Sequence, residues 1–168
     1  MIVTVDRTPG IEPGSRAPYF SMVAAGSGRR VSLRSCSGKP LVVIFHGREN
    51  AEVVRRINHE LRPHFPEPTA LTVASVIDLS FVPPFYWAVA NLELDRAYRQ
   101  AASELPPEVD PKDYVSILPD WTGSTTRKFR IRDAGRHAVV VVIGADSRVI
   151  GNYTEENPVG DVLSALQG

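Results

Sequence analysis

The segment Leu41-Val42-Val43-Ile44-Phe45, followed by His46-Gly47-Arg48-Glu49-Asn50, decides how the rest of the sequence is interpreted. Its first half is a continuous apolar run bounded by the break Gly38-Lys39-Pro40, which predicts a strand buried on both faces. Its second half is polar and leads into residues 51–62, where Val53, Val54, Ile57 and Leu61 share one helical face. We therefore predict a strand, a loop and a helix in that order, with Asn50 as the N-cap of the helix.

Further apolar segments extend this unit into an alternating pattern. Two short strands at 19–23 and 31–33 predict a hairpin on the amino side. On the carboxyl side we predict strands at 70–77, 115–118, 138–143 and 148–153, and helices at 84–103, at 124–129 and from an Asn157 cap to the end of the chain. Pro83 and Pro84 exclude a central strand at 81–86. The order predicts an α/β fold, with a central mixed β-sheet, helices on both faces and an N-terminal β-hairpin.

Length and composition bound the possible functions. A chain of 168 residues suits a single domain, 1–168, with the proline- and glycine-rich residues 1–13 as an extended lead-in. The formal net charge is zero, which argues against a nucleic-acid partner. The longest apolar run, Ala138–Ile143, is too short to span a bilayer, and the N-terminus has no signal-peptide pattern. We expect a cytoplasmic protein without a membrane partner.

Little in the sequence indicates a cofactor-binding or metal-binding site. Cys36 is the only cysteine, so neither an internal disulfide nor a zinc site of several thiolates is possible. No glycine-rich phosphate loop and no metal-ligand spacing stands out. We predict no cofactor and no metal.

Three segments of the chain resemble one large family. Gly14-Ser15-Arg16-Ala17-Pro18-Tyr19-Phe20 is similar to a G-x-x-A-P-x-F opening, and Val31-Ser32-Leu33 and residues 38–45 follow it as "SL" and "GK-P" do. Residues 117–123 resemble an "L-x-D" segment before a short helix, and residues 141–151 resemble a closing hairpin. Together they resemble the redoxin superfamily, which includes thioredoxin-like oxidoreductases and the alkyl hydroperoxide reductase/thiol-specific antioxidant (peroxiredoxin-like) proteins. The resemblance implies a thioredoxin-like fold with its active site at the start of the helix after the first buried strand.

The chain departs from this family at that site. Relatives carry a cysteine in the loop after the strand, where the helix N-terminus stabilises the thiolate. Residues 46–53 contain no cysteine, the Thr/Pro/Cys pattern of peroxiredoxins is absent, and Ala138 stands where thioredoxins place a cis-proline. Our leading hypothesis is a redoxin-like protein without the redox cysteine, acting as a non-catalytic binding or interaction module.

Candidate ligand-binding residues follow from the same comparison. His46, Arg48, Glu49 and Asn50 occupy the loop equivalent to the active site, and an anion would suit a helix start with Arg48 beside it. His46 could exchange a proton near neutral pH. Further candidates are Trp121, Arg136 and His137, from the segments after the third strand and before the fourth. The alternative is an ordinary solvated loop whose acidic residues suit the helix dipole.

Two more features remain open. Cys36 precedes the first buried strand, and it is either an incidental loop cysteine or the thiol of a divergent oxidoreductase or peroxidase. The segment Phe81–Trp87 combines aromatic residues and prolines, so it could either fill the core or form the surface of a homodimer or another protein partner.

Overall fold

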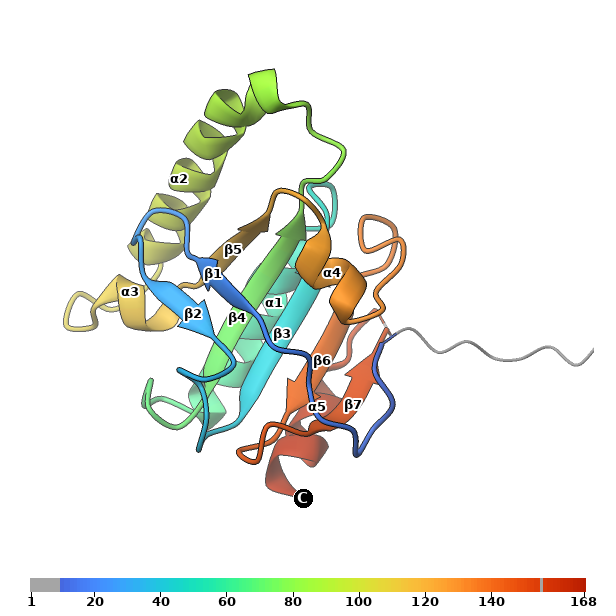
Figure 1. Ribbon diagram of the computed structural model, residues 1–168. Helices are drawn as coiled ribbons and strands as arrows, with labels where there is room; N and C mark the ends of the chain where they lie inside the picture. Colours follow the sequence, from blue (N-terminus) through green and yellow to red (C-terminus); the bar gives the residue numbers. More distant parts are fainter. Residues whose placement is uncertain (1–9, 155) are drawn as a thin grey trace, which may run out of the picture.

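The centre of the molecule is a five-stranded mixed sheet (Figure 1). The computed structural model describes residues 10–154 and 156–168. In the order β5-β4-β3-β6-β7, the strands are Ile117–Asp120, Thr72–Asp78, Leu41–His46, Val139–Ile143 and Val149–Tyr153. Strands β3, β4 and β5 are parallel, whereas β6 is antiparallel to both of its neighbours, β3 and β7. A separate antiparallel hairpin joins β1 (Ser21–Val23) and β2 (Arg30–Ser32).

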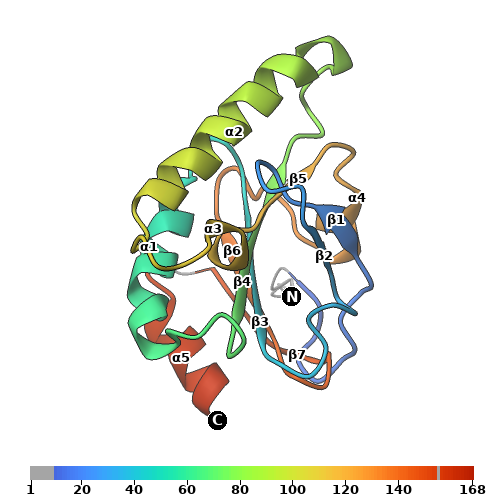
Figure 2. The same ribbon diagram turned by 90° about the vertical axis from the view of Figure 1, so that its left-hand side faces the viewer.

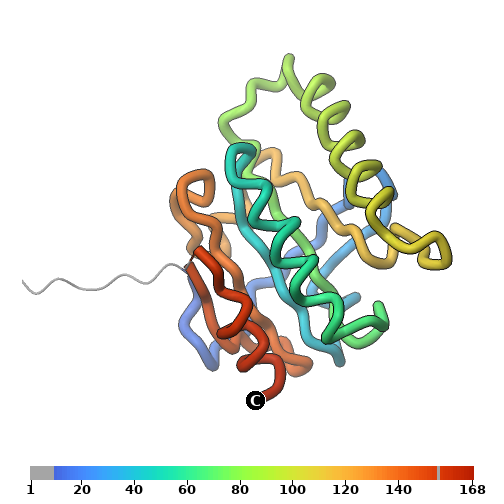
Figure 3. The backbone as a smooth tube through the Cα atoms, turned by 180° about the vertical axis from the view of Figure 1, so that it is seen from behind, coloured from blue at the N-terminus to red at the C-terminus, as the bar shows by residue number. Residues whose placement is uncertain are grey.

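Helices cover both faces of this sheet. The five helices of the described residues are α1 (Glu52–Leu61), α2 (Trp87–Ser103), α3 (Pro111–Tyr114), α4 (Ser124–Lys128) and α5 (Val159–Gln167). Figure 2 shows α1, α2 and α5 on one side of the sheet, and α4 with the hairpin on the other. From behind, α1 lies between α2 and α5 (Figure 3). The predicted fold class is therefore confirmed.

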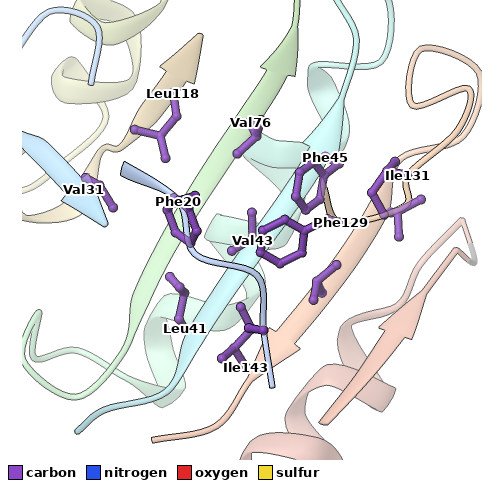
Figure 4. Close-up of a cluster of buried hydrophobic side chains, with 14 of the residues drawn as sticks. Phe20, Val31, Leu41, Val43, Phe45, Val76, Leu118, Phe129, Ile131 and Ile143 are labelled. Carbon is purple, nitrogen blue, oxygen red and sulfur yellow. The ribbon is translucent and has the colours of Figure 1, made fainter. Parts of the chain in front are cut away.

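The buried strand that the sequence predicted is the centre of the core. Every residue of β3 is buried, because helices lie over both of its faces. On the side of α4, Phe45 packs against Phe129, with ring centroids 5.1 Å apart, and Phe129 also contacts Phe20 (Figure 4). On the opposite side, Ile44 belongs to the cluster that contains Ile57 of α1. Apolar burial on both faces and pairing with β4 and β6 hold β3 in place, and thus set the place where α1 begins.

The main deviations from the predicted elements lie at helix starts. Helix α5 begins at Val159 after Pro158, and no side chain caps it, so the predicted Asn157 cap is wrong. The short helix α3 was not predicted; Asp110 caps it by accepting a hydrogen bond from the Lys112 N–H at 3.2 Å. The predicted lead-in at 1–13 lies mostly outside the described residues.

Candidate functional site

Two loops meet in the region between the end of β3 and the start of α1. The first follows β3, and the second is the segment before β6, which is the neighbour of β3 in the sheet. Together they line an open hollow of about 440 Å³, formed by Glu49, Asn50, Gly135, Arg136 and His137. Four of these five residues are sequence-predicted candidates. The hollow therefore lies where the resemblance placed an active site.

Asn50 holds the two loops together. Its Oδ1 accepts a hydrogen bond from the Gly47 N–H at 2.8 Å, and its Nδ2 donates one to the Ala134 carbonyl at 2.7 Å. Gly47 lies so close to the second loop that a Cβ on it would stand 2.6 Å from the Cα of Gly135. Since the Asn50 amide is used between the loops, the prediction that it caps α1 is wrong.

The N-terminus of α1 consequently has no side-chain cap. Ala51 occupies the cap position, and its side chain has no polar atom to offer. The N–H groups of Val53 and Val54 bind the carbonyls of Asn50 and Ala51 at 3.2 and 3.1 Å. A helix start of this kind carries partial positive charge and favours an anionic group. Arg136 and His137, on the opposite loop, add a guanidinium and an imidazole side chain to the same hollow.

His46 is the last residue of β3 and is buried. It is 4% exposed, and its Nδ1 is 2.7 Å from the Gly47 carbonyl. Because a carbonyl only accepts, Nδ1 carries the hydrogen, and Nε2 is left as a buried lone pair without a partner. Burial lowers the pKa of His46 from its usual 6.5, and the hydrogen bond to Gly47 opposes this only in part. The ring is thus neutral near pH 7.

The other two loop candidates lie outside the lining of the hollow. Arg48 forms an ion pair with Glu93 of α2 at 3.2 Å on the protein surface. Trp121 packs against Trp87, with ring centroids 5.1 Å apart. The sequence did not single out Gly135, although an Asp-Ala-Gly turn before a buried strand is a usable signal of a close backbone approach.

Cys36 lies at the other end of β3. It follows β2, it is 6% exposed, and its Sγ is 3.9 Å from the Ser35 hydroxyl. The six residues of β3 separate it from the hollow, which corresponds to roughly 17 Å of strand. Cys36 also lines a smaller cavity of about 160 Å³ that Arg29, Arg30 and Lys39 border.

The described part of the chain contains neither a metal-binding group of side chains nor a helix that could span a membrane. No three His, Cys, Asp or Glu side chains among residues 10–154 and 156–168 are grouped to hold a metal ion. No helix in these ranges has both the length and the apolar character needed to cross a bilayer.

Proteins similar to this chain are found among the solved structures. No family model matches the sequence, and no curated protein matches it significantly. Among solved structures, a candidate thiol:disulfide interchange protein DsbE from Chlorobium tepidum is similar at 15% identity and a TM-score of 0.61, over 93% of this chain and 99% of that one. A candidate protein disulfide isomerase from Bacteroides thetaiotaomicron gives 17% identity and a TM-score of 0.64, over 96% and 95% of the two chains.

A third neighbour is a candidate thioredoxin from Neisseria meningitidis, with 17% identity and a TM-score of 0.63 over 91% of this chain and 89% of that one. At these identities the likeness concerns the fold and not the activity. The strand order and the neighbours agree: this chain has a thioredoxin-like fold.

Proposed function

We propose that this protein is a redoxin-like binding module that has lost the redox cysteine and holds an anionic group of a ligand or partner in the hollow beside α1. One observation carries the proposal: neither loop that lines the hollow contains sulfur, and the only cysteine is buried at the opposite end of β3. Thiol chemistry at a helix start requires a thiolate there, which this chain cannot provide.

The residues of the hollow support binding of an anion. The start of α1 carries partial positive charge and no side-chain cap, while Arg136 and His137 face the hollow from the second loop. Glu49 is the only acid in the lining. Because the Asn50 bridge and the Gly47–Gly135 approach fix the two loops, the donors are held in place before a ligand arrives.

The absence of redox catalysis is tested on the purified full chain. We expect insulin reduction by dithiothreitol and thiol-dependent peroxide consumption to proceed as in a no-protein control. A rise of about tenfold or more over that control would overturn the non-catalytic assignment.

Anion binding is tested separately, by NMR titration of the ¹⁵N-labelled protein with acetate and with inorganic phosphate. We expect saturable shifts of the amides at the start of α1 and in the loop before β6. Arg136→Gln should abolish these shifts, whereas Arg48→Gln should keep them, because Arg48 pairs with Glu93 outside the hollow. Shifts that are unsaturable, or equal in the two variants, would contradict the proposed site.

A second candidate function rests on the cavity at Cys36. This cavity places a thiol beside three cations and Asp113, and a divergent oxidoreductase or peroxidase would need a cysteine next to such a substrate space. The burial of the thiol opposes this function, because the sulfur must reach its substrate. If the wild-type protein does accelerate either assay, Cys36→Ser decides: loss of the rate supports this candidate, and an unchanged rate removes it.

A further inference from the structure

Helix α2 has two apolar faces, of which only one packs against the protein. Its inner face contains Trp87, Ala90, Leu94 and Tyr98, which are buried or half-buried. Its outer face has the same helical spacing and begins with Phe85, of the preceding 3₁₀-helix, Val89 and Leu92. A surface helix ordinarily carries polar residues on its outer face, so an apolar outer face indicates a missing neighbour.

The exposure of this region is large for a monomer. Phe81, Phe85 and Tyr86 are 67%, 78% and 52% exposed, and Val89 and Leu92 are 53% and 58% exposed. At about 200 Å² for a whole aromatic side chain, the three aromatic residues alone present roughly 400 Å² to solvent. We call these five residues the α2 patch. In Figures 1 and 2 the N-terminal turns of α2, which carry part of it, extend beyond the end of the sheet.

A charged residue next to the α2 patch indicates which kind of partner would cover it. The outer face continues beyond Leu92 with Arg96, which forms no ion pair within the described part of the chain. The same face thus has an aromatic end, an aliphatic middle and a cationic end. If two such helices pack antiparallel about a twofold axis between Val89 and Leu92, each Arg96 meets the aromatic Phe85 of the other helix. Arginine over an aromatic ring is a favourable pair.

We propose that the occupant is a second copy of this chain, in a twofold dimer formed by antiparallel packing of α2 against α2. In this register Val89 of one copy contacts Leu92 of the other, and Phe85 contacts Arg96. The surface is self-complementary, as an interface between identical subunits must be. None of these residues lines the hollow beside α1, so the dimer is independent of the anion-binding proposal.

The available area is sufficient for such an interface. A specific interface of standard size covers about 800 Å² on each partner. Phe85 and Tyr86, whose ring centroids lie 4.7 Å apart, supply roughly a third of that, and Val89, Leu92 and the bordering residues extend it. A membrane surface fits less well, because Glu93 and Asp95 adjoin the apolar half of α2, whereas helices that lie on membranes carry Lys and Arg there.

The first experiment measures the mass of the full chain by sedimentation equilibrium over a concentration series. We expect a species of 36.8 kDa, twice the 18.4 kDa of one chain. Leu92→Glu should weaken association at least about tenfold. The matched control is Ile150→Glu on β7, an exposed apolar residue outside the patch, which should leave the dimer unchanged. A monomer at every concentration, or a dimer insensitive to Leu92→Glu, would overturn the proposal, as would binding of the monomer to lipid vesicles through the patch.

The second experiment tests the register. In the proposed register, Phe85→Glu places a carboxylate opposite Arg96 of the other copy, whereas Phe85→Lys places a second cation there. The Phe85→Glu variant should therefore dimerise more tightly than the Phe85→Lys variant. In an Arg96→Glu background the order should reverse, because the facing charge has changed sign. If the order is the same in both backgrounds, Phe85 and Arg96 do not meet and the antiparallel arrangement is wrong. Circular dichroism on each variant confirms that the exposed substitutions leave the fold intact.

Discussion

A methyl group added at Gly47 tests whether the two loops of the hollow are in fact pressed together. In the structure the Cβ of Gly47→Ala would stand 2.6 Å from the Cα of Gly135. The atom it meets belongs to the backbone, which cannot rotate away as a side chain would. One of the loops must therefore move, and the Asn50–Ala134 hydrogen bond at 2.7 Å that joins them must lengthen or break.

The expected cost follows from the size of this clash. Overpacking of a close contact costs about 1–3 kcal/mol. Loss of one of the two hydrogen bonds of Asn50 would add about 1 kcal/mol. We therefore expect Gly47→Ala to lower the free energy of unfolding by about 2–4 kcal/mol, and to lower Tm by roughly 4–16 °C for a chain of this size.

Gly135 provides the matched control. A Cβ on Gly135 has no neighbouring atom within 4 Å, and its φ is not in the positive range where a side chain is strained. Gly135→Ala should therefore change the free energy of unfolding by less than about 1 kcal/mol, and could raise it by restricting the unfolded chain. Urea unfolding followed by tryptophan fluorescence measures both variants. Equal stabilities for Gly47→Ala and Gly135→Ala would refute the close approach of the loops.

Three further predictions concern single polar side chains. Burial lowers the pKa of His46, so the unfolded chain binds a proton at this residue before the folded chain does as the pH falls below about 6.5. The free energy of unfolding should therefore fall by up to about 1.4 kcal/mol per pH unit. Urea unfolding at several pH values should show this slope in the wild type and not in His46→Leu. Asn50→Ala should cost about 2 kcal/mol, for two lost hydrogen bonds, while Asn91→Ala on the exposed face of α2 costs nearly nothing; equal effects would contradict the bridge. Asp120→Ala should cost about 3 kcal/mol in thermal unfolding, because its buried carboxylate accepts two hydrogen bonds at 2.8 and 2.7 Å, whereas exposed Asp95→Ala should stay within about 0.5 kcal/mol.

The sequence predicted those parts of the structure that follow from local periodicity. The continuous apolar run at 41–45 predicts a strand buried on both faces, as β3 is. The spacing of Ile57 and Leu61 predicts which face of α1 is buried. Helix α3 was missed although its signal is local: Asp110 followed by Pro111 is a usual helix start. Pro106, Pro107 and Pro111 together are also typical of a stiff connection, which hides a helix of one turn.

The candidate site was predicted only in part, because its geometry joins distant segments. Asn50 and Ala134 are 84 positions apart, and nothing near Asn50 reveals that a carbonyl from the second loop will accept its side chain. A local N-cap and a tertiary bridge use the same amide, so the sequence alone favours the local choice. Arg48 illustrates the same limit, since only the placement of α2 brings Glu93 within 3.2 Å of it.

A thioredoxin-like fold can lose its thiol and keep the shape of its site, because the forces that build the site lie elsewhere. The start of α1 is placed by β3, which is buried by Phe45, Phe129 and Phe20 on one face and by the α1 and α5 cluster on the other. No residue of the hollow contributes to these clusters. The helix start therefore stays in place without a cysteine, and it keeps the partial positive charge of a helix N-terminus. A helix start without a thiol still attracts an anion but cannot exchange a disulfide, which is the physical reasoning behind the binding function proposed for this chain.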